Sequence, residues 1–135
     1  MNFDVPYGFS VRLRGVGIDA VKPRVVEALQ AEGFGVLSEI DVQATLKKKL
    51  GVERAPYLIL GACNPALAKQ ALEAEPAIGL LLPCNVVIAE DGAETVVSMA
   101  SPRAMFEVVK STDGLAAVAT DAEARLRRAL DRLKS

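Results

Sequence analysis

The chain contains 135 residues with a mass of 14.3 kDa, which is the size of one ordinary domain. Apolar residues make up 51% of it and charged residues 24%, a composition that argues against disorder. Its 16 basic and 17 acidic residues leave a net charge of −1, so we expect neither a nucleic-acid nor an acidic-membrane partner. The chain has no histidine, which excludes Ser-His-Asp and Cys-His catalysis and zinc sites that use imidazole.

The sequence also bears on location in the cell. Residues 1–15 lack the basic start, apolar core and small-residue cleavage site of a secretory signal. The longest apolar stretch, residues 77–88, is shorter than the roughly twenty residues that a membrane helix needs. Two cysteines, Cys63 and Cys84, are too few for a disulfide scaffold. These features predict a cytoplasmic protein with reduced thiols, and we expect no cofactor and no membrane partner.

The first half of the chain alternates between strand and helix patterns. Apolar and polar or small residues alternate over residues 7–13, which predicts a strand with one solvated face. Asp19 can cap a helix that ends at Gly33, where a left-handed cap suits glycine. A second strand and a short helix, capped by Asp41, are expected over residues 34–40 and 41–50.

The second half continues this pattern. The continuous apolar run at residues 56–62 is typical of a central strand, and Asn64 with Pro65 predicts a helix start. Asp91-Gly92 is the dipeptide of a tight hairpin turn. The other elements expected here are a strand within residues 80–89, a returning strand around residues 95–97, a short helix from Ser101-Pro102 and a long amphipathic helix from about Asp113 or Leu115.

This order of elements predicts the fold class. The hairpin and the strand with a solvated face favour an antiparallel or mixed sheet rather than a parallel one. We therefore expect a single α+β domain over residues 1–135, built as a two-layer sandwich. About five strands form its sheet, and the helices pack on one face.

Two motifs identify a resemblance. GACNP at residues 61–65 and LLLPCNVV at residues 80–87, together with residues 33–52 and the closing helix, resemble the family called domain of unknown function 302. The resemblance covers nearly the whole chain. It implies a compact α+β domain of bacteria and archaea, often dimeric, with no established activity. This chain departs from the family pattern at Lys69, where many relatives carry a histidine.

Cys63 carries the sharpest local chemistry. It lies between a predicted buried strand and a helix that Asn64 caps, so backbone N–H groups at the helix start can favour a thiolate. One interpretation is a reactive thiol or a soft-metal ligand. The other is a small buried residue that fits a tight corner between strand and helix, which is the commoner case.

Cys84 follows Pro83, which cannot donate to a sheet and so indicates an edge, a bulge or a break in the strand. A two-residue loop at Asp91-Gly92 would place Cys84 opposite Met99 in the hairpin. Cys63, Cys84 and Met99 could then form a sulfur cluster suited to Cu(I). The alternative is that Cys84 and Met99 only fill the core.

The remaining candidate residues are polar. Glu39 and Asp41 lie two apart and could share a face, although paired carboxylates need burial for acid–base work and Asp41 already caps a helix. The candidate ligand-binding residues are thus Cys63, Asn64, Cys84, Asn85 and Glu39.

Three functions are compatible with these residues. The first is a small-ligand or soft-metal binding domain with its site where GACNP faces LLLPCNVV. The second is a homodimeric interaction module without a small-molecule site, and the third is redox or enzymatic chemistry at a cysteine. A concave pocket beside Cys63 would favour binding, whereas a flat apolar surface would favour self-association.

Self-association is also expected from the apolar content. The mean hydropathy of +0.27 is high for a chain with so much surface to cover. The strands at residues 56–62 and 80–89 are apolar on both faces, but helices on one face of the sheet can cover only one side. We expect a homodimer formed by the other side or by the adjacent helix near residues 64–74.

Overall fold

An antiparallel sheet is the centre of the computed structural model, which describes residues 1–109 and 113–134. The sheet has five strands in the order β1-β5-β4-β3-β2, and every neighbouring pair is antiparallel. The strands are β1 (Gly8–Arg14), β2 (Gly35–Asp41), β3 (Tyr57–Cys63), β4 (Cys84–Asp91) and β5 (Glu94–Ala100). The predicted α+β fold is confirmed.

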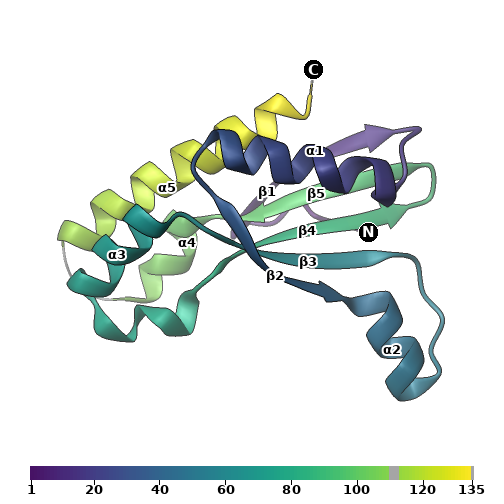
Figure 1. Cartoon of the computed structure of the whole chain (residues 1–135), viewed down its shortest axis with the longest axis horizontal. Helices are drawn as coiled ribbons and strands as arrows, with labels where there is room; N and C mark the ends of the chain where they lie inside the picture. Colours follow the sequence, from purple (N-terminus) through teal and green to yellow (C-terminus); the bar gives the residue numbers. More distant parts are fainter. Residues whose placement is uncertain (110–112, 135) are drawn as a thin grey trace.

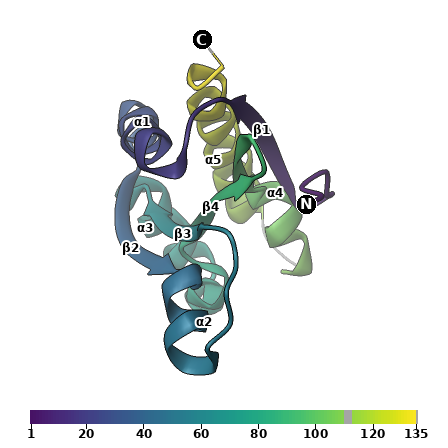
Figure 2. The ribbon, with the colours of Figure 1, turned by 90° about the vertical axis from the view of Figure 1, so that its right-hand side faces the viewer.

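Helices surround this sheet unevenly. Figure 1 shows α1 and α5 along one face, α3 and α4 at one end, and α2 projecting on the opposite side; Figure 2 shows the same separation from the side. The helices are α1 (Ile18–Ala31), α2 (Val42–Leu50), α3 (Pro65–Ala74), α4 (Pro102–Met105) and α5 (Asp113–Arg132), with 3₁₀ turns η1 (Pro76–Leu81) and η2 (Phe106–Val108). None of the described helices is long and apolar enough to cross a membrane.

Two separate clusters of buried side chains stabilise the fold. The larger, which we call the sheet core, joins α1, the sheet and the C-terminal half of α5, and it contains Leu29, Leu60, Ile88 and Leu126. The smaller, the end core, packs α3, η1 and η2 against the N-terminal half of α5. Its buried members are Leu67, Ala71, Ile78, Phe106, Leu115, Val118, Ala119 and Ala122. Helix α5 belongs to both cores and connects them.

Side chains cap the helices largely as predicted. Asp41 Oδ1 accepts a hydrogen bond from Ala44 N at 2.9 Å, and Asn64 Oδ1 accepts one from Leu67 N at 3.2 Å. The predicted Asp19 cap is wrong, because α1 begins at Ile18 and Gly17 is its N-cap. A carboxylate from another element replaces that cap: Glu90 Oε2 accepts from Ile18 N at 2.9 Å.

Two expectations for the hairpin need correction. Residues 80 and 81 belong to η1 rather than to a strand, and β4 begins only at Cys84. In the hairpin, Asp91 pairs with Glu94, and Gly92 takes the first loop position with φ +62°. The register therefore differs by two residues from the expected one, and Met99 lies opposite Val86 instead of Cys84.

A buried carboxylate fixes α4 to α5. Glu123 accepts hydrogen bonds from Ser101 Oγ, from Arg103 N at 3.3 Å and from Arg127 Nε at 3.2 Å. Burial alone would raise the pKa of Glu123, but these donors hold it below its usual value. Because Ser101 also caps α4 through Ala104 N, this one carboxylate positions the chain that closes the end of the sheet.

Candidate functional site

A cavity of about 420 Å³ lies between the sheet core and the end core. Its walls come from β2, β3, the start of β4, α3, α4 and α5, so both cores contribute. The residues that line it are Phe34, Leu37, Ser38, Ala62, Cys63, Asn64, Leu67, Ala68, Ala71, Leu72, Leu82, Pro83, Cys84, Pro102, Phe106, Val118 and Ala122. Its volume falls in the usual range of small-molecule sites, about 300–1,000 Å³.

Small side chains leave this space open. Ala62, Ala71 and Ala122 are buried on its walls, and each presents only a methyl group. Exposed residues form its rim, among them Leu37, at 71% exposure, and Leu72, at 45%. Leu37 lies where the pairing of β2 with β3 shifts register between Val36 and Ser38. The bulge thereby places an apolar side chain at the mouth of the cavity.

Both cysteines line the cavity as free thiols. Cys84 of β4 lies opposite Ala62 of β3 in the sheet. Because Cys63 follows Ala62 in β3, the two thiols come from adjacent strands. Burial raises the pKa of Cys84 to about 11, and the nearby Cys63 adds to the rise. Cys84 is therefore a neutral thiol at physiological pH, whose sulfur contributes apolar, polarisable surface.

The start of α3 offers few donors to a thiolate at Cys63. Pro65 has no N–H group, Leu67 N donates to the Asn64 side chain, and Ala68 N donates to Asn64 O at 2.8 Å. Most of the backbone N–H groups that were expected to favour a thiolate at Cys63 are therefore absent or already bonded. Asn64, a lining residue, satisfies the helix start with its Oδ1 atom, and its amide nitrogen lies next to Gly33.

Several candidate residues lie elsewhere. Met99 is fully buried in the sheet core and does not line the cavity, although Cys84 packs against the same core. Glu39 forms an ion pair with Lys22 of α1. Asn85 pairs with Gly61 in the sheet, and its side chain is exposed. The predicted group is thus split: Cys63, Asn64 and Cys84 come together, and the other three do not.

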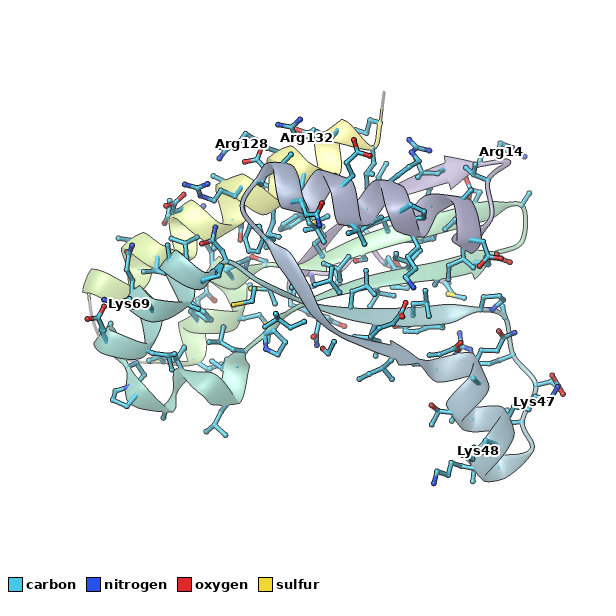
Figure 3. All side chains as sticks on the ribbon, in the orientation of Figure 1. Arg14, Lys47, Lys48, Lys69, Arg128 and Arg132 are labelled. Carbon is cyan, nitrogen blue, oxygen red and sulfur yellow. The ribbon has the colours of Figure 1, made fainter. Side chains whose placement is uncertain are left out.

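Lys69 also lies outside the cavity. It extends from the outer side of α3 in Figure 3, is 75% exposed and forms an ion pair with Glu73 at 2.9 Å. Among residues 1–109 and 113–134, no three His, Cys, Asp or Glu side chains gather where they could hold a metal ion.

Sequence reasoning missed the apolar walls. Phe34, Phe106, Val118 and Ala122 come from segments far apart in the chain and have no motif around them. The sequence signal for Val118 and Ala122 is the apolar stripe of α5, which predicts a buried face but not that a space lies beside it.

The fold is an α+β domain with an open apolar cavity between its two cores. The family model for the domain of unknown function DUF302 matches residues 9–133, and the chain belongs to that family. A similar solved structure is the crystal structure of an uncharacterised conserved DUF302 protein from Bacillus stearothermophilus, with 31% sequence identity and a TM-score of 0.86. The match covers 95% of this chain and 98% of that one. No protein of curated function matches the chain.

Proposed function

We propose that this protein binds a small apolar ligand in the cavity between the two cores. The observation that carries the proposal is the cavity itself, which is large, apolar and open at the Leu37 and Leu72 rim. Small-molecule sites are concave, mostly apolar and about 300–1,000 Å³ in volume, and this open cavity of about 420 Å³ has all three properties. A cytoplasmic location, which keeps both thiols reduced, fits this function.

The thiols support ligand binding better than they support metal binding or catalysis. A soft metal would find two sulfur ligands on the wall, Cys63 and Cys84, with Met99 buried out of reach of the cavity. Cysteine catalysis needs a thiolate and a base, but burial keeps Cys84 protonated and the chain has no histidine. Both sulfurs instead add soft, polarisable contact surface for an apolar ligand.

Filling the cavity tests the proposal. Ala68 lines the cavity from α3 and is half-buried, so an Ala68→Leu side chain extends into the space without deep repacking. We expect the wild-type protein to bind the neutral fluorophore N-phenyl-1-naphthylamine with increased emission. Ala68→Leu is expected to weaken that binding at least tenfold.

Ala66→Leu is the matched control, because Ala66 lies on the same helix, is exposed and does not line the cavity. This variant should bind the fluorophore like the wild type. Circular dichroism and thermal unfolding must show that both variants are folded. Equal binding by Ala68→Leu and wild type would place the fluorophore elsewhere and contradict the proposal.

A homodimer is the second candidate function, and the exposed side of the sheet favours it. Helix α2 projects from that side and has no buried residue. Leu50 at its end is 70% exposed, Val52 is 44% exposed and Ile40 on the neighbouring edge strand is 50% exposed. A nine-residue helix is marginal on its own, so a second copy that covers these side chains would stabilise it.

Sedimentation equilibrium at micromolar concentration tests the dimer. We expect a species of twice 14.3 kDa for the wild type and a monomer for Ile40→Glu, because the charge would be buried at the interface. Leu80→Glu is the control, since Leu80 is 88% exposed on η1, away from α2. A wild-type protein that sediments only as a monomer would rule this candidate out.

A further inference from the structure

The cavity lining carries no formal charge. Of the described residues that line it, none is Lys, Arg, Asp or Glu. Arg125 on α5 is already bound to Asp121 at 2.9 Å and donates to Glu32 O at 3.4 Å. A charged ligand group that entered the cavity would lose its water and find no opposite charge, which costs several kcal/mol.

Two neutral polar groups at the cavity have hydrogen-bonding capacity to spare. Asn64 uses its Oδ1 atom for the Leu67 N–H, and among the described residues its Nδ2 atom donates to no acceptor. Ser38, an exposed residue at the edge of the cavity, likewise has no partner for its Oγ atom within the described part of the chain. Both can donate to an oxygen atom of a ligand, and neither can neutralise a negative charge.

The helix start beside them attracts an anion only weakly. Pro65 lacks an N–H group, and the N–H groups of Leu67 and Ala68 are already bonded to Asn64. Helix α3 therefore lacks the array of free donors that makes other helix starts bind phosphate or carboxylate. Electrostatics and hydrogen bonding agree in selecting an uncharged ligand.

We propose that the ligand is an uncharged molecule with an apolar chain or ring and one hydrogen-bond acceptor oxygen, such as a ketone or an ester. The apolar part fills the space between Ala62, Ala71 and Phe106, and the oxygen accepts from Ser38 or Asn64. Sites of small molecules span about 300–1,000 Å³, so a cavity of about 420 Å³ suits a ligand at the lower end of that size range. This inference rests on the proposed function and adds the chemical class of the ligand.

Three ten-carbon probes of equal length test the charge selection. Each competes with N-phenyl-1-naphthylamine at pH 7.5: the neutral 2-decanone, the anion decanoate and the cation decylammonium. We expect 2-decanone to displace the fluorophore, and each ion to bind at least tenfold more weakly. Between pH 5.5 and 7.5 the affinity for decanoate should fall about tenfold per pH unit, because only the neutral acid enters, while that for 2-decanone stays constant.

Ser38→Ala tests the acceptor oxygen separately. Loss of one hydrogen bond should weaken 2-decanone binding about three- to tenfold and leave the fluorophore, which carries no oxygen, unaffected. Decanoate or decylammonium binding as tightly as 2-decanone would overturn the inference while the proposed function stands. A protein that binds neither the fluorophore nor any of the probes would overturn the proposed function itself.

Discussion

Replacing Gly61 by alanine is expected to lower the free energy of unfolding by about 1–3 kcal/mol, the usual cost of overpacking an interior position. Gly61 is buried in β3, and a Cβ atom there would overlap Ser38 Oγ and lie 2.7 Å from Pro83 Cγ. The serine side chain can rotate away, but the proline ring is fixed to its backbone. Unfolding in urea should therefore show a lower midpoint at an unchanged slope.

Gly79→Ala is the matched control for this prediction. Gly79 lies in η1, and no atom beyond its own helical turn lies within 4 Å of the Cβ position, so its substitution should change stability by less than about 0.5 kcal/mol. Because Ser38 and Pro83 also line the cavity, Gly61→Ala should weaken ligand binding as well, whereas Gly79→Ala should not. Equal stability of the two variants would mean that Gly61 is not needed for the close approach of β2 and residue 83.

Local hydrogen bonds made parts of this fold predictable from sequence. Asp41 and Asn64 each cap a helix through the backbone N–H three residues on, an interaction that depends only on nearby residues. The start of α1 depends instead on Glu90, a residue 72 positions away from Ile18. No local pattern contains that contact, so Asp19 was the wrong choice of cap.

The register of the hairpin and the presence of the cavity also depend on contacts that no local sequence pattern contains. Asp91-Gly92 indicates a turn, but the pairing of Asp91 with Glu94 decides which residues occupy the loop, and with it the position of Met99. Side chains of a strand alternate between the two faces of the sheet, so a register shift of two residues leaves each side chain on the same face. The buried face of β5 was therefore predictable, but the residue opposite Met99 was not. The cavity exists because the sheet core and the end core lie some distance apart. Apolar periodicity predicts which residues are buried in each core, but it does not predict the distance between the cores.

Alkylation of Cys84 is expected to be about 100-fold slower near neutral pH than that of a cysteine with an ordinary pKa. The thiolate is the species that reacts, and each unit of pKa changes its fraction tenfold. Burial raises the pKa of Cys84 from 9.0 to about 11, with Cys63 as a smaller cause. The rate with iodoacetamide should therefore rise about tenfold per pH unit from pH 7 and level off only near pH 11.

Mass spectrometry of the labelled peptides separates Cys84 from Cys63, which we expect to react first. Cys63→Ser should leave the Cys84 rate nearly unchanged, because burial is the larger cause of the raised pKa. In urea both cysteines should react at ordinary rates, which controls for the intrinsic reactivity of the two sequences. A Cys84 rate that levels off near pH 9 would show that water reaches this thiol in the folded protein. The cavity wall would then be more polar than an apolar ligand requires.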